Sequence, residues 1–332
     1  MIEVLNTPLF LTWEVTNRCN LRCKVCYNAS TDMHPSEINE SEASFIIDAI
    51  ADCKPIFVNL TGGEPFLRPD IVKIAKRFID KGTDPQLATN GSVYNEEMFL
   101  QMKSIGVKSI QVSFDGFEAA HDAIRGSGSF KRALKTLKFL IDNGFSAKVG
   151  TIVTRLNYLD IAEFTKYFYE LGIKKLGVFR FVPTGRGREN QSLQLDADDL
   201  VWLQEKLEQL ESRYGIAFFK CDHSLAVFLG KKKNAGGCEL GLKCLCIKPN
   251  GDVLGCPFFP VVLGNVRETS LVKIWQDSPI LKEIREDIRP ERLLGKCVSC
   301  PNGIKEKCRG GCKALAYETT GSIRQPDPRC WR

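Results

Sequence analysis

Short apolar runs alternate with amphipathic stretches along the first part of this 332-residue chain. The runs are rich in β-branched residues, which is typical of buried strands. The predicted strands are Leu9–Val15, Ile56–Leu60, Pro85–Thr89, Ser109–Phe114, Ser146–Val153 and Lys175–Val182. Between them apolar residues recur at helical spacing, and several of these stretches end in glycine, the expected C-cap residue. The predicted helices are Ser41–Cys53, Asp70–Gly82, Asn95–Gly106, Ser129–Gly144 and Tyr158–Gly172.

The order of these elements predicts an α/β fold. Strand and helix alternate along the chain, which favours a parallel sheet with right-handed crossovers. Six strand–helix units are two short of a closed eight-fold barrel. We therefore expect a partial, TIM-like (β/α)6 barrel with its chemistry at the carboxyl ends of the strands. An open, doubly wound sheet is the structural alternative.

The pattern changes after a further predicted helix, Asp196–Gly215. From Cys221 onward Gly and Pro become frequent and the periodic patterns weaken. This part also holds ten of the fourteen cysteines. We expect it to be organised by bound metal rather than by a large apolar core.

Composition and charge narrow the class of protein. Apolar residues make up 43% of the chain and charged residues 26%, as in ordinary soluble proteins. No apolar run approaches the length of about 18 residues that marks a membrane span, and the N-terminus lacks the features of a signal peptide. We therefore expect a cytoplasmic protein with no membrane partner. In a reducing cytosol, fourteen cysteines indicate metal ligands rather than disulfides.

The net charge of +6 does not indicate nucleic-acid binding. Lys and Arg are scattered among nearly as many Asp and Glu, and the one cationic run, residues 230–234, is interpreted as a solvated loop. No nucleic-acid partner is predicted.

Three thiols lie in the loop directly after the first predicted strand. Cys19, Cys23 and Cys26 have the spacing C-x3-C-x2-C. Three thiolates on a cubane of four irons would leave one iron without a protein ligand, and reactive metal sites keep such an open position. A zinc site that takes a fourth cysteine from elsewhere is the alternative.

This loop resembles that of radical S-adenosylmethionine (SAM) enzymes. The resemblance implies a [4Fe–4S] cluster on the three cysteines, whose open iron is chelated by the amino and carboxylate groups of SAM. It also implies reductive cleavage of SAM to a 5′-deoxyadenosyl radical that abstracts hydrogen from a substrate. A flavodoxin or ferredoxin would supply the electron.

The motif "TGGEP" after the second predicted strand strengthens the resemblance. It is similar to the GGE motif of the family. By that similarity Gly62 and Gly63 let the backbone approach the ligand, and Glu64 accepts hydrogen bonds from the SAM ammonium.

Later strand ends carry three further candidate SAM contacts. Asn90 lies in "ATNGS" after the third strand and Ser113 in "VSFDG" after the fourth. By similarity Ser113 would bind the SAM ribose, and Arg125 the SAM carboxylate or ribose. The alternative for Arg125 is a surface ion pair. Asp115, in the same motif as Ser113, is open to interpretation as the cap of its turn.

Other charged residues at the strand ends are open to two interpretations. Arg180, Arg186 and Arg188 surround the exit of the sixth strand, where they would bind an anionic substrate group or form a solvated basic loop. The three histidines of the chain, His121 among them, are not spaced as ligands and are interpreted as structural.

The second cysteine field resembles the SPASM extension of radical SAM enzymes. Its pattern is C-x12-G-x4-C, then C-x2-C-x7-C-x3-C, then a distant cysteine, with seven residues where many members have five. The resemblance implies two auxiliary [4Fe–4S] clusters and thus three in all. The first auxiliary cluster would use Cys238, Cys244, Cys256 and Cys312, and the second Cys297, Cys300, Cys308 and Cys330. A pair of interleaved zinc sites is the alternative. The implied domains are a barrel, residues 1–215, and a SPASM domain, residues 216–332.

Three cysteines remain unassigned. Cys53 is expected to be a small buried hydrophobe, and Cys221 has no assigned role. For Cys246 a spare thiol, a hydrogen-atom donor and an alternative cluster ligand all stay open.

Together the resemblances imply a radical SAM/SPASM oxidoreductase. They suggest the oxidation, cross-linking or decarboxylation of a ribosomal peptide or small biosynthetic intermediate. The alternatives are modification of a haem-type tetrapyrrole side chain, epimerisation, methyl transfer, or a non-catalytic zinc- or iron-binding protein. Pro257 stands where sulfatase-maturating members carry an Asp, which disfavours that reaction. The first strand begins by Leu9, so we expect no leader-binding module before it, and a peptide substrate would be bound directly or through a separate recognition protein.

Overall fold

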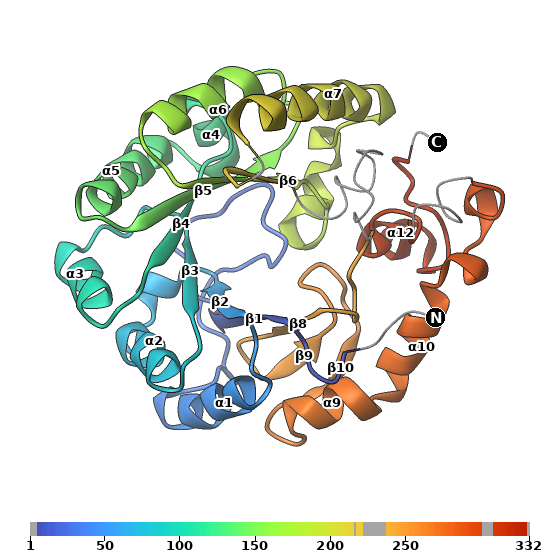
Figure 1. The fold of residues 1–332 in the computed structure, drawn as a ribbon, viewed down its shortest axis with the longest axis horizontal. Helices are drawn as coiled ribbons and strands as arrows, with labels where there is room; N and C mark the ends of the chain where they lie inside the picture. Colours follow the sequence, from blue (N-terminus) through green and yellow to red (C-terminus); the bar gives the residue numbers. More distant parts are fainter. Residues whose placement is uncertain (1–4, 216, 222–236, 301–307, 331–332) are drawn as a thin grey trace.

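A computed structural model describes residues 5–215, 217–221, 237–300 and 308–330 (Figure 1). Its strands are β1 Phe10–Thr16, β2 Phe57–Gly62, β3 Pro85–Thr89, β4 Ser109–Ser113, β5 Ser146–Val153, β6 Lys175–Arg180, β7 Phe219–Cys221, β8 Cys244–Ile247, β9 Asp252–Leu254 and β10 Val262–Asn265. Its helices are α1 Glu40–Asp52, α2 Ile71–Asp80, α3 Glu96–Ser104, α4 Glu118–Arg125, α5 Ser129–Asp142, α6 Ile161–Glu170, α7 Ala197–Tyr214, α9 Leu271–Asp277, α10 Pro279–Asp287 and α12 Lys313–Thr320.

The strands form one curved sheet in the order β10-β9-β8-β1-β2-β3-β4-β5-β6-β7. The six predicted strands are its parallel block β1 to β6, and the predicted partial TIM-like barrel is confirmed. Two short parallel strands that the sequence pattern did not predict extend this block. Strand β7 pairs with β6, and β8 pairs with β1. Antiparallel β9 and β10 complete the sheet beyond β8.

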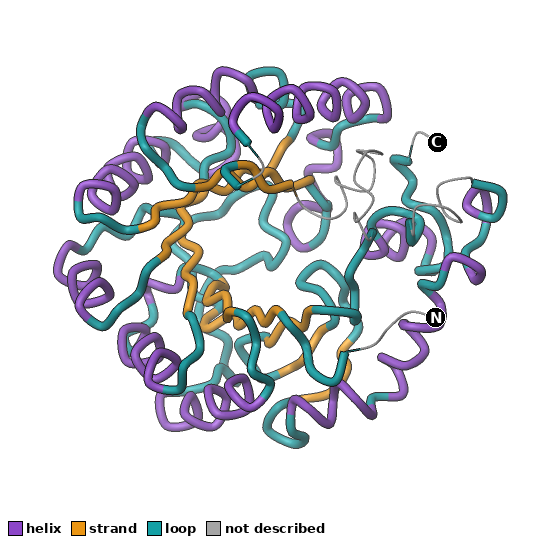
Figure 2. The backbone as a smooth tube through the Cα atoms, viewed as in Figure 1, coloured by secondary structure: helices purple, strands orange, loops and turns teal. Residues whose placement is uncertain are grey.

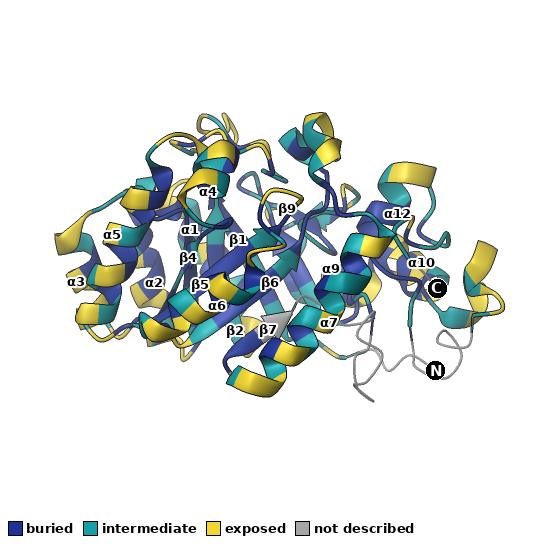
Figure 3. Ribbon diagram, turned by 90° about the horizontal axis from the view of Figure 1, so that it is seen from above, coloured by how far each residue is buried: buried dark blue, intermediate teal, exposed yellow. Residues whose placement is uncertain are grey.

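The helices lie outside the arc of strands, as Figures 1 and 2 show. Helix α1 begins at a capping box, in which Asn39 and Glu42 satisfy each other's backbone N–H groups. Helix α2 ends as the glycine pattern predicts. Gly82 has φ +75°, and the next residue, Thr83, donates to the carbonyl of Phe78 at 2.9 Å. Figure 3 shows the exposed residues on the outer faces of the helices and the buried ones toward the sheet.

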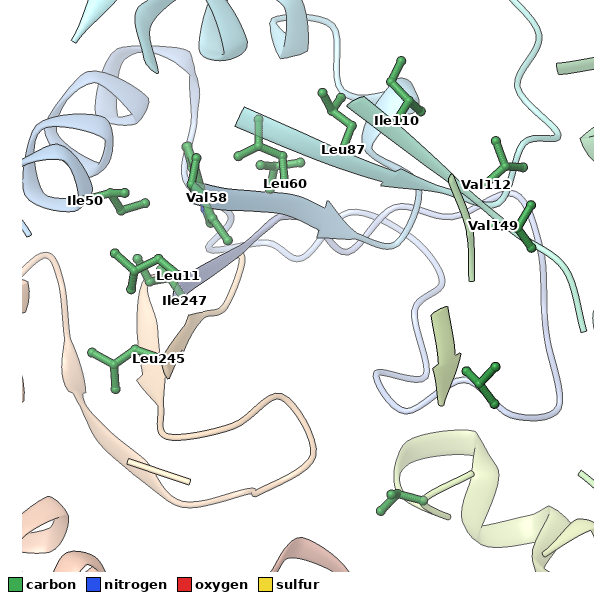
Figure 4. Packing of buried hydrophobic residues seen from close by; sticks show 14 of the residues in the cluster. Leu11, Ile50, Val58, Leu60, Leu87, Ile110, Val112, Val149, Leu245 and Ile247 are labelled. Atoms are coloured by element: carbon green, nitrogen blue, oxygen red, sulfur yellow. The ribbon is translucent and has the colours of Figure 1, made fainter. Parts of the chain in front are cut away.

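One apolar core joins both halves of the chain. Leu11 on β1 lies in register with Val58 on β2 and with Leu245 on β8, and all three side chains are at most 1% exposed. Figure 4 shows Leu11 beside Ile247 and Leu245, which belong to the cysteine-rich part. Trp275 of α9 is part of the same cluster. The expectation that the second half lacks a substantial apolar core is therefore wrong, because β8 pairs directly with the barrel.

Three sequence features lie outside the described residues. They are the cationic run 230–234, His223, and the seven-residue insertion 301–307. Among the described residues, every helix is too short or too polar to cross a membrane.

Candidate functional site

The loop after β1 carries Cys19, Cys23 and Cys26, and it is held by the exits of other strands. The N–H of Lys24 donates to the carbonyl of Ile124 in α4 at 2.9 Å. From the loop after β6, the N–H of Arg186 donates to the carbonyl of Cys26 at 3.0 Å. These contacts fix the backbone around the three cysteines from two sides.

The guanidinium of Arg186 adds a second clamp on this loop. It donates to the carbonyls of Cys23 and Ser30, each at 3.1 Å. Beside it, a Cβ on Gly185, which has φ +55°, would lie 2.2 Å from the carbonyl oxygen of Tyr27. Only glycine permits this approach, so the loop after β6 serves as the support of the cysteine loop.

The three thiols are partly buried neighbours. The pKa of Cys23 is raised to about 11, chiefly by burial, with Asp115, Cys26 and Cys19 adding to the effect and Arg125 opposing it. Burial also raises the pKa of Cys19, with Glu64 and Cys26 adding to the effect. Thiolates here therefore require a cationic partner, which a bound metal supplies.

The paired glycines act on the protein itself. A Cβ on Gly62 would lie 2.3 Å from the carbonyl oxygen of Thr16, and one on Gly63 would lie 2.2 Å from that of Arg18. The N–H groups of Gly63 and Glu64 donate to these same two carbonyls, at 2.7 and 2.8 Å. The space that the missing side chains leave is thus filled by the end of β1. This close packing locks the exits of β1 and β2 together. The approach of the Gly62–Gly63 backbone to a ligand stays a prediction.

Glu64 is fully buried at the end of β2. Its carboxylate accepts from the N–H of Phe66 at 3.2 Å, the hydroxyl of Thr89 at 2.7 Å and the N–H of Asn90 at 2.8 Å. Burial raises its pKa to about 7 despite these hydrogen bonds. The side chain of Asn90 lies close by, with Nδ2 at 3.9 Å from Sγ of Cys19. The structure therefore brings Glu64 and Asn90 together beside the cysteine loop.

Arg125 forms a buried ion pair, and the surface alternative for it is wrong. Its Nε donates to Asp115 at 2.7 Å, with side chains 10% and 0% exposed. Burial lowers the pKa of Arg125, but Asp115 and the thiols of Cys23 and Cys26 raise it more. Asp115 does not cap its turn but accepts from the N–H of Ile152 at 2.8 Å. The cation is therefore held facing the cysteines.

His121 and Ser113 occupy contrasting places near this pair. Nδ1 of His121 accepts from the N–H of Asp115 at 3.1 Å, and burial lowers the pKa of His121 to about 4, so it is neutral and structural. Ser113 ends β4 half-buried, and its hydroxyl makes no hydrogen bond within the described part of the chain.

The other arginines at the exit of β6 are bound within the protein. Arg180 forms a buried two-bond pair with Asp327, at 2.5 and 3.1 Å. Arg188 pairs with Glu318 of α12 at 2.6 Å. With Arg186 on the cysteine loop, all three join elements of the fold. Arg180 is buried and Arg186 partly buried, whereas Arg188 is exposed to solvent in its pair. Binding of an anionic substrate group by these arginines stays a prediction.

The cysteines of the second field form two neighbouring groups. Burial raises the pKa of Cys244 to about 12, with Cys238 adding to it, and Cys238 also acts on Cys256 and Cys312. In the other group, burial raises the pKa of Cys297, and Cys308, Cys330 and Cys300 act on it. The members of each predicted ligand set thus act electrostatically on one another, and the ligand sets themselves stay a prediction. Within the described ranges, no three His, Cys, Asp or Glu residues are placed to hold a single metal ion. Four thiols per group suit the four irons of a cubane.

Two of the unassigned cysteines are now placed. Cys53 is 1% exposed in the apolar core, as predicted. Cys246 is fully buried on β8, and its thiol lies 3.6 Å from the carboxylate of Glu14 on β1. Glu14 is also fully buried and accepts from Lys248 at 2.6 Å and from the hydroxyl of Tyr27 at 3.2 Å. Sequence reasoning missed Glu14, whose only signal is its position in β1 on the face opposite Trp13.

Comparison with known proteins assigns the family. A family model described as the radical SAM superfamily matches residues 13–188, more than half of the chain. The chain belongs to this superfamily. A second model, SPASM, described as an iron-sulfur cluster-binding domain, matches residues 238–301 of this radical SAM enzyme. It therefore binds SAM and iron–sulfur clusters.

Curated relatives span the whole of the radical SAM chain. The AdoMet-dependent heme synthase of Methanosarcina barkeri is 34% identical over 99% of this chain and 98% of its own. The mycofactocin maturase MftC of Mycobacterium tuberculosis is 33% identical over 98% of this chain and 83% of its own.

Solved structures share the fold. SuiB of Streptococcus suis bound to S-adenosylmethionine aligns with a TM-score of 0.80 at 21% identity, over 99% of this chain and 78% of its own. SuiB bound to its precursor peptide SuiA aligns with a TM-score of 0.79 at 20% identity, over 99% and 77%. At this identity the likeness concerns the radical SAM fold alone.

Proposed function

We propose that this enzyme is a radical SAM/SPASM oxidoreductase with three [4Fe–4S] clusters. Cys19, Cys23 and Cys26 would hold the SAM cluster, and the two groups of four cysteines defined above would hold the auxiliary clusters. The observation that carries the proposal is the surroundings of the first three thiols. Among the described residues, the ionisable groups that act on the pKa of Cys19 and Cys23 are other members of the trio with Glu64, Arg125 and Asp115, and no fourth cysteine is among them. One iron would remain open for SAM.

When bound, this cluster and SAM together supply a 5′-deoxyadenosyl radical. The chain's own residues would orient the SAM molecule. Glu64 would accept a hydrogen bond from the SAM ammonium. Asn90, which lies beside Cys19, would cover the same side of the SAM molecule. Arg125 gives one N–H to Asp115, and within the described residues its two terminal nitrogens make no hydrogen bond, so they would contact the SAM carboxylate or ribose. Ser113, on the neighbouring strand end, would bind the ribose.

Glu64→Gln is expected to weaken SAM binding by about 10- to 150-fold, since it removes a charge-assisted hydrogen bond of about 1.5–3 kcal/mol. Because burial raises the pKa of Glu64 to about 7, the ionised acceptor appears as the pH rises through that value. Wild-type SAM affinity should thus tighten about tenfold between pH 6 and pH 8, whereas the variant should show no such rise. Equilibrium binding to the anaerobically reconstituted enzyme, followed by the EPR signal of the reduced cluster, measures both effects.

Glu37→Gln is the matched control. Glu37 lies in the same loop as the cysteines and accepts from the N–H of Asn17 at 3.0 Å, and no hydrogen bond within the described residues joins it to Glu64. Its SAM affinity should stay within twofold of wild type. Equal affinities of the Glu64 variant and this control would remove Glu64 from the SAM site.

The proposed reaction is hydrogen abstraction from a peptide or a small biosynthetic intermediate, followed by oxidation, cross-linking or decarboxylation. The mycofactocin maturase, 33% identical over 98% of the chain, supports this class, and the SuiB complex shows a precursor peptide on the same fold. A flavodoxin or ferredoxin would donate the first electron. A separate recognition protein would present a peptide substrate. An auxiliary cluster would accept the electron that the substrate radical gives up.

SAM turnover tests the proposal directly. The chain is reconstituted anaerobically with iron and sulfide, then given SAM and dithionite. We expect about twelve irons per chain and release of 5′-deoxyadenosine. A deuterated substrate peptide should transfer its label to 5′-deoxyadenosine and lose two hydrogens net, whereas an epimerase or methyltransferase would leave no such loss. Zinc in place of iron, or well-formed clusters without 5′-deoxyadenosine, would favour a non-catalytic binding protein.

A tetrapyrrole is the second candidate substrate. The observation in its favour is the AdoMet-dependent heme synthase, 34% identical over 99% of the chain. Incubation with a haem-precursor porphyrin under the same conditions separates the two. A mass loss from a porphyrin side chain, with no change in any peptide, would make the chain a tetrapyrrole-modifying enzyme.

A further inference from the structure

Lys313 is a buried cation at an unfavourable position. It is the first residue of α12, directly after Cys312, and its side chain is fully buried. A positive charge at a helix N-terminus opposes the helix dipole, and a buried charge is costly unless it is paired. Its ammonium donates to the carbonyl of Gln325 at 3.0 Å, the only hydrogen bond it makes within the described ranges. One neutral acceptor does not compensate a buried ammonium, so other negative groups must do so.

The negative groups that face Lys313 come from both groups of auxiliary cysteines. Burial lowers the pKa of Lys313, and Cys238, Cys297, Cys308 and Asp327 oppose this effect. Cys238 belongs to the first proposed cluster, and Cys297 and Cys308 belong to the second. Asp327 is already engaged by Arg180 in two hydrogen bonds. As cluster ligands, the thiolates of Cys238, Cys297 and Cys308 would therefore be the further counter-charges of the ammonium beside Asp327.

The backbone at Gly310 lies beside both the ammonium of Lys313 and the thiol of Cys297. Gly310 has φ +78°, and a Cβ there would lie 2.6 Å from Nζ of Lys313 and 3.3 Å from Sγ of Cys297. A single methyl group would thus touch both atoms. Glycine at this turn therefore avoids a side chain that would clash with the ammonium and crowd the thiol.

A second cation lies in the same short segment. Arg309 follows Cys308 and donates to the carbonyl of Cys238 at 3.3 Å, so it too reaches from one group to the other. Burial lowers the pKa of Arg309, against Cys238, Glu239 and Cys308. The segment 308–313 therefore carries one cysteine of each group, Cys308 and Cys312, and a cation follows directly after each of them.

We propose that Lys313, with Arg309 beside it, is a shared counter-charge of the two auxiliary clusters that raises the reduction potential of both. The inference rests on the proposed function, because it takes the two cysteine groups as cluster ligands. One-electron reduction adds a negative charge to a cluster, and a buried cation next to it stabilises that charge most where water is excluded. Lys313 thus acts on the auxiliary clusters through its positive charge. This charge makes the clusters better acceptors of the electron that the substrate radical gives up.

The test is an EPR-monitored redox titration of the reconstituted full-length enzyme. Lys313→Gln keeps a donor for Gln325 but removes the charge, and Lys313→Arg keeps the charge. For Lys313→Gln we expect the reduced-to-oxidised ratio of both auxiliary clusters to fall at least tenfold at fixed potential, a shift of 59 mV per tenfold change. Lys313→Arg should stay within threefold of wild type. If Lys313 had a merely structural role, Lys313→Arg would change the ratios more than Lys313→Gln, or neither variant would change them.

Lys243→Met is the matched control. Lys243 is next to Cys244, but it pairs with Glu239 and is 45% exposed, so water screens its charge. Its ratios should stay within twofold of wild type. If Lys313→Gln loses its clusters during purification, Arg309→Gln takes its place and should lower both ratios in the same direction. Unchanged ratios in a fully loaded charge-removing variant would overturn the inference while leaving the proposed function intact. Absence of iron from the wild type would instead overturn the proposed function.

Discussion

Replacing Cys19, Cys23 and Cys26 together by alanine is expected to abolish SAM cleavage while about eight irons per chain remain bound, the content of two cubane clusters. The loss should be complete, because the open iron on which SAM docks exists only at a cluster with three protein ligands. The remaining irons should persist because the auxiliary groups lie elsewhere in the fold, on the loops around β8 and α12. Iron analysis and chromatographic detection of 5′-deoxyadenosine measure the two quantities.

Cys53→Ala supplies the control for the triple variant. Its thiol is 1% exposed in the apolar core and contacts the carbonyl of Ala49, away from every proposed ligand. Its iron content and SAM cleavage should match those of the wild type. Residual cleavage by the triple variant, or loss of all its iron, would contradict the assignment of these cysteines.

Asp327→Asn is expected to destabilise the enzyme by about 3–5 kcal/mol, the usual cost of leaving one partner of a buried ion pair alone. Asp327 is fully buried and accepts two hydrogen bonds from Arg180 of β6. The same carboxylate accepts from the N–H of Cys312 at 2.9 Å. The change should therefore also lower the occupancy of the first auxiliary cluster. Denaturant unfolding of the loaded enzyme, with iron analysis, measures both.

Asp277→Asn tests whether burial is the cause of that effect. Asp277 pairs with Lys282 at 3.8 Å on the surface, with side chains 62% and 59% exposed. Such pairs contribute about 0–1 kcal/mol, so this variant should unfold close to wild type. Equal unfolding midpoints of the two variants would show that the pair of Asp327 with Arg180 does not stabilise the contact between the barrel and the C-terminal part.

Much of the barrel could be predicted from the sequence because its strands are buried by helices and by one another. Strand β5 is an example, since the predicted range Ser146–Val153 is also the observed one. Strands β7 and β8 escaped prediction. Each has at most four residues, too few to show a period, and β8 is recognisable only through its register with β1. The same pairing extends the apolar core into the cysteine-rich part.

The candidate site, like the fold, could be predicted from the sequence only in part. Spacing within a short loop grouped Cys19, Cys23 and Cys26, because ligands of one cluster that are close in the chain leave a local pattern. Glu14 left none, since its partners Cys246 and Lys248 lie more than 200 positions away. Arg186 was likewise open to several interpretations until its hydrogen bonds to the cysteine loop were seen.

The sequence by itself determined the family, the alternation of strands and helices, and the close spacing of Cys19, Cys23 and Cys26. Each of these is written in residues that are neighbours along the chain or that repeat at a fixed period. Only the tertiary structure decided how the charged residues pair: Arg180 with Asp327, Arg125 with Asp115, and Lys313 between two groups of thiols. The strength of such a charge depends on its burial and its neighbours, and both arise when distant segments pack together.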